Sequence, residues 1–147
     1  MHIALTLNGA PATAELSPET TLLHWLRETR GLMAAKPGCE IGRCGACAVL
    51  LDGRLVNACL VLAWQADGAA VITAEGLEAL PQGRAARAAL GEESAFQCGY
   101  CAPGMSVALT AWLLAGQGEA HAALAGNLCR CTGYGGVLRA AARARPG

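Results

Sequence analysis

The feature that most constrains this chain is a run of closely spaced cysteines in its first half. Four and then two residues separate the first three, and eleven more precede the fourth: they are Cys39, Cys44, Cys47 and Cys59. A C-x4-C-x2-C array with a distant fourth cysteine is the spacing that holds a plant-type [2Fe–2S] cluster through four thiolates. The sequence therefore predicts that these four side chains bind one such cluster.

The glycines of the same segment agree with this prediction. Gly38, Gly42 and Gly45 lie beside or between the first three cysteines. Because glycine has no Cβ, it reaches positive φ easily and lets the backbone approach another group closely. Both properties help a loop to turn its N–H groups toward anionic sulfur. We expect these glycines to shape the loop around the cluster.

A disulfide framework is the main alternative for eight cysteines in 147 residues. Residues 1–9 lack the basic region of a secretory signal and reach an Asn-Gly turn too early for one. No apolar run approaches the roughly 18 residues of a membrane span. We therefore expect a cytoplasmic protein whose thiols bind metal. The net charge of zero gives no basis for binding nucleic acid.

Short apolar alternations predict strands in the first half. Strands at residues 3–7 and 12–16 flank Asn8-Gly9, and strands at 48–51 and 54–56 flank Asp52-Gly53; both dipeptides favour tight hairpins. Residues 71–73 predict a last strand. Ser17-Pro18 resembles a helix start, and Gly31 a helix end. The first half therefore predicts a compact α+β unit that extends to about residue 76.

The periodicity becomes helical after residue 80. Helices are predicted over residues 81–90, from Pro103 onward, over 119–125 and over 136–145. The helix that begins at Pro103 has the clearest apolar stripe, which predicts core packing rather than a cofactor contact. The second half therefore predicts a small helical unit.

A second group of four cysteines belongs to this helical half. Cys98 and Cys101 are followed, after 27 residues, by Cys129 and Cys131. Zinc sites usually combine C-x2-C with another C-x2-C or with histidines, whereas the second pair here is C-x-C. Each pair precedes a predicted helix. We expect two antiparallel helices to bring their N-termini to one place, where the helix dipoles favour an anionic cluster.

Three segments together resemble a known family. They are Gly-Cys-Glu-Ile-Gly-Arg-Cys-Gly-Ala-Cys at 38–47, Gln-Cys-Gly-Tyr-Cys-Ala-Pro-Gly at 97–104 and Gly-Asn-Leu-Cys-Arg-Cys-Thr-Gly-Tyr at 126–134. The chain is identified on these segments as similar to the iron–sulfur subunits of the molybdenum hydroxylases, the xanthine oxidase family. The resemblance covers nearly the whole chain, including Glu75-Gly76-Leu77 at the junction.

The resemblance implies an α+β fold with two domains. Residues 1–76 would form a β-grasp, plant-ferredoxin-like domain, and residues 77–147 a small four-helix-bundle domain. Each would hold one [2Fe–2S] cluster, the second on Cys98, Cys101, Cys129 and Cys131. The family also implies a large partner subunit that carries the molybdopterin cofactor. By the same analogy Gln97 would hydrogen-bond the pterin, and Cys131 would lie between the cluster and the pterin edge.

The function implied is electron transfer within an oxidoreductase complex. Electrons would come from a molybdenum centre that oxidises an aldehyde, a purine, an N-heterocycle or carbon monoxide. They would leave to a flavin subunit carrying FAD, to a cytochrome or to another external acceptor. A freestanding ferredoxin-like carrier is the alternative, although such carriers usually use strong acidity to steer docking. A zinc-stabilised interaction module is a third reading, which bound zinc in place of iron would favour.

Overall fold

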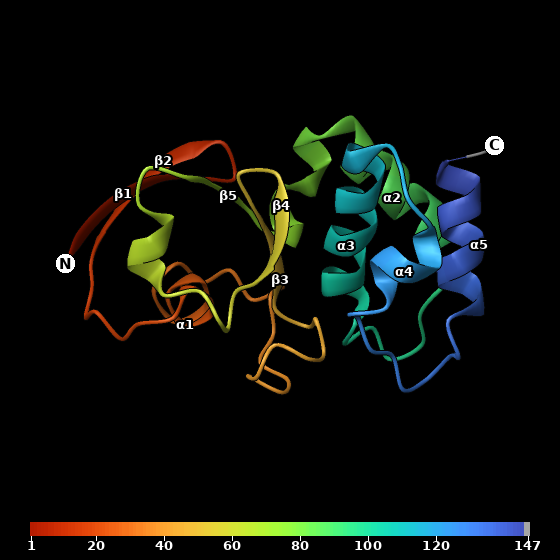
Figure 1. The fold of residues 1–147 in the computed structure, drawn as a ribbon, viewed down its shortest axis with the longest axis horizontal. Coiled ribbons are helices and arrows are strands. Elements are labelled where there is room, and N and C mark those ends of the chain that lie inside the picture. The colour runs from red at the N-terminus through yellow and green to blue at the C-terminus, as the bar shows by residue number, and fades with distance from the viewer. Residues whose placement is uncertain (146–147) are drawn as a thin grey trace.

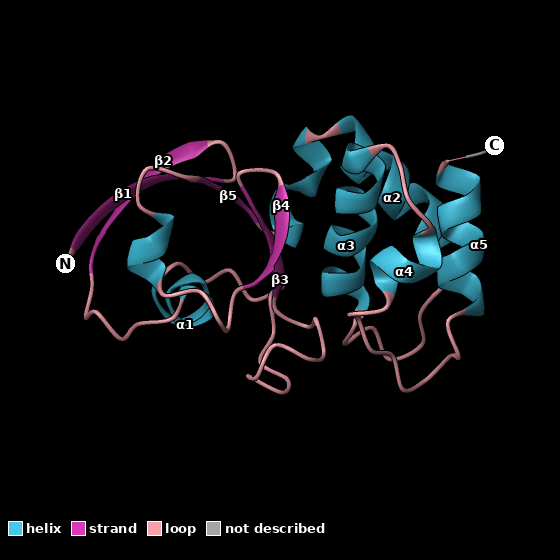
Figure 2. Ribbon diagram, viewed as in Figure 1, coloured by secondary structure: helices cyan, strands magenta, loops and turns pink. Residues whose placement is uncertain are grey.

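The computed structural model describes residues 1–145. The N-terminal half is a curved sheet with a short helix inside its curve, and the C-terminal half consists of helices (Figure 1). Figure 2 shows that all strands lie in the first half. This arrangement confirms a mixed sheet followed by a helical part. Within residues 1–145, no helix has both the length and the apolar character needed to cross a bilayer.

Five strands form one mixed sheet in the order β2-β1-β5-β3-β4. Their bounds are β1 His2–Leu7, β2 Ala10–Glu15, β3 Ala48–Leu51, β4 Arg54–Asn57 and β5 Ala70–Ile72. The central pair, β1 and β5, is parallel, and the other neighbours are antiparallel. Two local hairpins are thus joined through β5, which enters the sheet between them.

Both predicted hairpins are confirmed. Asn8 and Gly9 connect β1 to β2, and Asp52 and Gly53 connect β3 to β4, all four with positive φ. Two consecutive residues with positive φ match the twist of the flanking strands, which is why Asn-Gly and Asp-Gly favour such turns.

The helix inside the sheet begins later than predicted. Helix α1 spans Leu22–His24 and continues as the π-helix η1, Trp25–Thr29. Ser17 and Pro18 belong instead to a preceding turn, in which Thr20 N donates to Ser17 O over 3.0 Å. Thr21 caps the helix, because its hydroxyl accepts from His24 N at 3.1 Å. The predicted end is correct, since Gly31 follows with φ +68°.

Strand β3 is buried on both faces and therefore joins the two halves. Val49 packs into the core around α1, together with the fully buried Trp25. Ala48 and Leu50 point the opposite way and pack against Val107 of α3. Side chains alternate between the faces of a strand, so one apolar run serves two cores. Helix α3 stands against this face of the sheet in Figure 1.

Four helices make up the second half. Their bounds are α2 Pro81–Glu92, α3 Ala102–Ala115, α4 Ala120–Leu124 and α5 Gly135–Ala144. Helix α2 passes the predicted end at Gly91 by one residue. In α3, Pro103 lies in the first turn, where its missing N–H costs nothing. Most of the predicted stripe of α3 is buried, including Met105, Leu109 and Trp112, whereas Leu113 is half-buried.

The connection between the halves is held by the first hairpin turn. Two short 3-10 helices, η2 Ala63–Ala66 and η3 Ala74–Ala79, flank β5. The side-chain oxygen of Asn8 accepts from Thr73 N at 2.9 Å, and its amide donates to the Thr73 hydroxyl at 3.0 Å. A Cβ on Gly76 would lie 2.3 Å from that same Asn8 oxygen. Glycine is therefore required where the chain leaves the sheet.

Candidate metal centres

The loop before β3 gathers the first cysteine group. Three backbone N–H groups, of Ile41, Arg43 and Cys44, donate to Cys39 Sγ over 3.1–3.4 Å. Cys44 Sγ accepts from Cys39 N at 3.4 Å and from Ala46 N at 3.5 Å. Such donors stabilise thiolate over thiol. The N–H groups of Ile41 and Arg43 thus lower the pKa of Cys39 to about 6.

The predicted glycines of this loop have two separate roles. Gly42 and Gly45 have φ of +76° and +73°, as predicted. Gly38 is needed for space, because a Cβ there would lie 2.6 Å from Cys44 Sγ. The loop also contains Glu40 at φ +54°, a left-handed conformation that the sequence did not indicate. The backbone is therefore folded tightly around the sulfur atoms.

Cys47 and Cys59 complete the first group from the side of the sheet. Cys47 is buried in the core around α1, and Cys59 lies two residues beyond β4. Burial raises the pKa of Cys47 to about 12, and the adjacent Cys59 and Cys44 side chains add to that effect. A metal ion bound there would displace a proton, since a metal ligand must be the thiolate.

The second group forms where two helices begin. Cys131 and Cys129 lie near enough to Cys98 to affect its pKa, and Cys129 and Cys98 lie near enough to Cys101 to affect that of Cys101. The N–H of Tyr100 lowers the pKa of Cys98, and the hydroxyl of Thr132 lowers that of Cys129. Burial raises the pKa of Cys101 to about 12. The structure thus brings all four predicted cysteines together.

The helix ends converge as predicted, but the predicted relative direction was wrong. Helices α3 and α5 both begin at the lower edge of the molecule in Figure 1, so they run in the same direction. Cys101 is the N-cap residue of α3, and Tyr134 that of α5. Two positive dipole ends therefore face the thiols, which stabilises negative charge there. Helix α2 packs against both α3 and α5, and the short helix α4 in the connection between them allows this shared direction.

The gathering of the thiols in two groups of four suits two-iron clusters. Within residues 1–145, no three His, Cys, Asp or Glu side chains converge as ligands of a single metal ion. A [2Fe–2S] cluster makes a different demand, because its four thiolates are divided between two irons. Within each group the thiols lie near enough to affect one another's pKa: Cys44 and Cys59 affect Cys47, and Cys98, Cys101 and Cys129 affect one another. Eight thiols therefore suit two such clusters.

Sequence reasoning missed three residues that connect the two cysteine groups. Leu128 N donates to Cys44 O at 2.9 Å, and Asn127 Nδ2 donates to Gly45 O at 3.2 Å. The Tyr100 hydroxyl donates to the Pro37 carbonyl. All three lie within two residues of a predicted ligand. A polar side chain this near a ligand was the signal that could have identified Asn127 and Tyr100.

Gln97 is exposed and lies in the loop between α2 and α3, directly before Cys98. Its predicted contact with a pterin would involve another chain and stays a prediction. Cys131 is likewise exposed.

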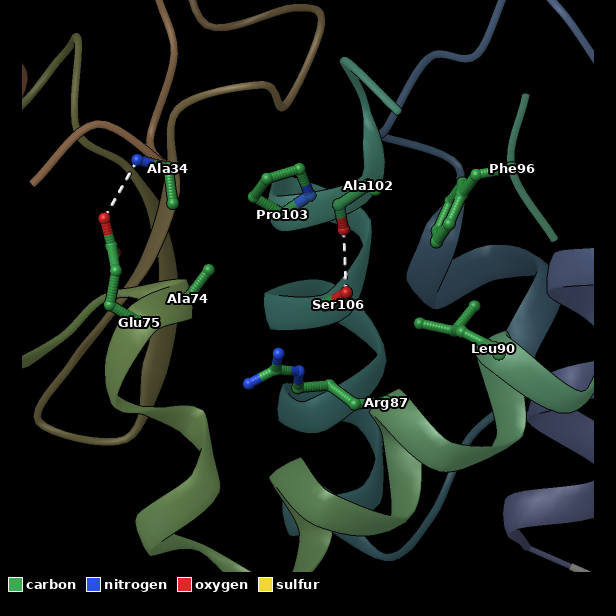
Figure 3. Close-up of a pocket in the computed structure, with 10 residues that line it drawn as sticks. Ala34, Ala74, Glu75, Arg87, Leu90, Phe96, Ala102, Pro103 and Ser106 are labelled. Carbon is green, nitrogen blue, oxygen red and sulfur yellow. Dashed lines mark hydrogen bonds between the residues drawn. The ribbon is translucent and has the colours of Figure 1, made fainter. Parts of the chain in front are cut away.

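A cavity of about 610 Å³ lies between the two halves. Figure 3 shows its polar groups engaged within the chain: Glu75 accepts from Ala34 N at 2.9 Å, and the Ser106 hydroxyl donates to Ala102 O at 2.7 Å. Arg87, which also lines it, pairs with Glu78 at 2.9 Å. Its ten lining residues include no cysteine or histidine. The cysteine groups lie outside this cavity.

Two family models match the chain, and both describe iron–sulfur proteins. Residues 5–74 match the 2Fe-2S iron-sulfur cluster binding domain, and residues 73–142 match the [2Fe-2S] binding domain. The fold and the paired thiols therefore belong to a protein with two [2Fe–2S]-binding domains.

Individual relatives define the family more closely. A probable xanthine dehydrogenase subunit from Bacillus subtilis is 46% identical over 96% of this chain and 83% of its own length. The crystal structure of quinoline 2-oxidoreductase from Pseudomonas putida 86 matches with TM-score 0.87 and 38% identity, over 96% of this chain and 90% of that one. Aldehyde oxidoreductase from Desulfovibrio gigas matches with TM-score 0.83 and 34% identity, over 98% of this chain and 17% of that one.

The chain belongs to the iron–sulfur subunits of the molybdenum hydroxylases, the xanthine oxidase family. It is thus the iron–sulfur part of an oxidoreductase whose substrate site lies on another subunit. The resemblance read from residues 38–47, 97–104 and 126–134 is confirmed.

Proposed function

We propose that this chain is the electron-transfer subunit of a molybdenum hydroxylase, with two [2Fe–2S] clusters. The first would be held by Cys39, Cys44, Cys47 and Cys59, and the second by Cys98, Cys101, Cys129 and Cys131. The observation that carries the proposal is the gathering of all eight thiols into two groups of four, each within one of the two matched iron–sulfur domains. When bound, each cluster stores one electron.

The residues around the thiols have roles that follow from charge. A cluster with four thiolates is anionic, so N–H groups and helix N-termini directed at sulfur stabilise it and tune its potential. The first loop supplies N–H groups from within itself, to Cys39 and Cys44. The second group has one such donor, from Tyr100 N to Cys98 Sγ at 3.5 Å, and also lies at the starts of α3 and α5. The two clusters would therefore differ in potential.

The proposal includes two domains and their partners. Residues 1–76 would be the β-grasp ferredoxin-like domain and residues 77–147 the four-helix-bundle domain; residues 146–147 lie outside the described part. A large subunit with the molybdopterin cofactor would contact the second group near Gln97 and Cys131, both exposed. A flavin subunit with FAD, or a cytochrome, would accept electrons from the first group, beside which Ile41 and Leu60 are 64% and 59% exposed.

Names of relatives suggest a substrate class but not one substrate. The relatives include a xanthine dehydrogenase subunit, a quinoline oxidoreductase and an aldehyde oxidoreductase. We therefore propose that the complex oxidises a purine, another N-heterocycle or an aldehyde, with carbon monoxide as the remaining class. Free thiols suit a reducing compartment, so we propose assembly in the cytoplasm.

Metal analysis and EPR test the proposal directly. The complex is purified from its native host, and iron, acid-labile sulfide, molybdenum and zinc are measured for each copy of this chain. We expect two irons per cysteine group and two S = 1/2 signals after reduction with dithionite. Zinc in place of half of the iron, with one signal, would overturn the two-cluster assignment. Both signals without a co-purifying molybdenum subunit would favour a freestanding carrier.

A further inference from the structure

The two cysteine groups are fastened to each other by direct hydrogen bonds across the boundary between the halves. The segment 126–128, just before Cys129, lies against the loop that carries Cys44. Leu128 N donates to Cys44 O at 2.9 Å, and the side chain of Asn127 donates to Gly45 O at 3.2 Å. Asn127 is 4% exposed, so the hydrogen bond is made by a buried side-chain amide.

The contact is sterically tight at Gly45. A Cβ on Gly45 would lie 2.5 Å from Asn127 Nδ2 and 2.6 Å from Gly126 O. A Cβ on Gly104, in the first turn of α3, would lie 2.2 Å from Gly45 O. Glycine at position 45 is thus needed for the approach of the other half as well as for its φ. The peptide around Gly45 is clamped from two elements of the helical half.

A second fastening lies at the other end of the same loop. Tyr100, between Cys98 and Cys101, donates its hydroxyl to the carbonyl of Pro37. The Lys36 ammonium lies 5.5 Å from the centre of the Tyr100 ring, a cation–π distance. Pro37 comes two residues before Cys39. The segment around Cys98 and Cys101 therefore contacts the start of the first cysteine loop, and the segment before Cys129 contacts its end.

We propose that Asn127 and Tyr100 are positioning residues that set the separation and relative orientation of the two clusters. This inference rests on the proposed two-cluster function. With both clusters bound, these contacts would serve the transfer of one electron: the cluster of the helical half would lose one electron, that of the first half would gain it, and no bond would form or break. The path from Cys44 through its carbonyl to Leu128 N and on to Cys129 contains a single hydrogen bond.

Two variants and a matched control test this inference in the purified complex. Asn127→Ala removes the buried amide donor, and Tyr100→Phe removes only a hydroxyl from a side chain that is 49% exposed. Asn57→Ala is the control, because Asn57 Nδ2 also donates to a glycine carbonyl of the loop, Gly42 O at 3.3 Å, but from within the first half. Tyr100→Phe keeps the test possible if Asn127→Ala does not assemble.

The readout is the magnetic interaction between the two reduced clusters. When dithionite reduces both, their spins broaden or split each other's EPR signals, and a sample poised with one cluster reduced gives the undisturbed reference. We expect Asn127→Ala to lose much of the splitting and to slow transfer between the clusters severalfold after rapid one-electron reduction. Tyr100→Phe should reduce the splitting and the transfer rate less, and Asn57→Ala should have the same splitting and rate as the unaltered complex. Iron content should stay constant in all.

Other outcomes separate this inference from the proposed function. If the unaltered complex shows one signal or half of the iron, the two-cluster function itself is wrong. If it shows two signals without interaction, or if both variants keep its splitting and transfer rate, only the positioning role is overturned. An equal loss of splitting in Asn57→Ala would also overturn the positioning role, because any disturbance of the first cysteine loop would then be enough to abolish the magnetic interaction.

Discussion

The two cysteine groups hold their thiols in different ways. In the first, three of the four cysteines lie within the nine residues from 39 to 47, and N–H groups of the same loop donate to sulfur. In the second, two short motifs 27 residues apart meet only because α3 and α5 begin at the same edge (Figure 1). The first geometry is mostly local, whereas the second depends on helix packing.

The contacts between the two cysteine groups suggest that the geometry of the second group depends on that of the first. The segment before Cys129 rests on the first loop through Cys44 O and Gly45 O. The first loop has its own donors to Cys39 and Cys44, in addition to those contacts. The second group should therefore need the first more than the first needs the second.

Loss of one ligand in each group gives the largest expected effect. We expect Cys101→Ser to remove the second cluster and to leave the first EPR signal close to full intensity. Cys47→Ser should remove the first cluster and also weaken the second signal, because it disturbs both the loop and the core in which Cys47 is buried. Iron content and EPR integration measure both. A full second signal in Cys47→Ser would show that the groups are independent.

The sequence predicted the local turns of the first half well. The two hairpins followed from Asn-Gly and Asp-Gly, because these turns depend on neighbouring residues alone. The start of α1 was misplaced, since capping by Thr21 competes with a Ser-Pro turn that has the same local appearance. The direction of α3 relative to α5 and the contact between Gly45 and Asn127, 82 residues apart, depend on tertiary packing. No local pattern encodes them.

A glycine substitution tests how far the two groups share one structure. We expect Gly45→Ala to destabilise the protein by more than about 3 kcal/mol, because left-handed strain is added to contacts of 2.5 and 2.6 Å with Asn127 and Gly126. Gly53→Ala is the control. Gly53 has φ +78° but open space around its Cβ position, so only the strain of about 1 kcal/mol applies.

Thermal loss of visible absorbance from the clusters, measured with iron content, distinguishes these two variants. Gly45→Ala should lower the midpoint most and reduce both EPR signals. If Gly45→Ala behaves like Gly53→Ala, the clamp around Gly45 gives way easily, and the dependence between the groups is weak.

The end of α5 provides a test confined to the helical half. The Arg145 guanidinium lies 3.4 Å from the centre of the Trp112 ring and donates to Trp112 O at 2.6 Å. We expect Arg145→Ala to destabilise this half by about 2 kcal/mol through loss of the cation–π contact and a hydrogen bond. The second cluster should then be lost at lower temperature than the first.

The matched control for Arg145 lies in the other half. Arg30 is 5.7 Å from the centre of the Trp25 ring, so Arg30→Ala removes a weaker contact from the N-terminal half. Its effect on either cluster should be smaller. EPR spectra of samples heated to a series of temperatures measure the loss of each cluster. If Arg145→Ala loses both clusters at the same temperature, the helical half does not unfold separately.

The smallest expected effect concerns an ion-pair network between Glu93, at the end of α2, and the arginines of α5. Glu93 accepts from Arg143 Nη2 at 2.6 Å and from Arg139 Nε at 2.9 Å. Hydrogen bonds from Arg143 and then Arg139 lower the pKa of Glu93. A carboxyl whose pKa is lower in the folded chain contributes stability above its unfolded pKa, about 4.3 for Glu, and loses that contribution as pH falls through the folded pKa.

We therefore expect Glu93→Gln to lower the urea midpoint of the helical half slightly at pH 7, and this difference to narrow as pH falls below about 4.3. Comparing both proteins at the same pH cancels any acid lability that the clusters share. Glu78→Gln is the control, since Glu78 pairs with Arg87 where both side chains are about half exposed, and such pairs contribute little. A difference for Glu93→Gln that stays constant down to about pH 3, well below the unfolded pKa, would show that its contact depends on shape rather than charge. The helical half would then owe its geometry, and that of the second cysteine group, more to packing than to this ion-pair network.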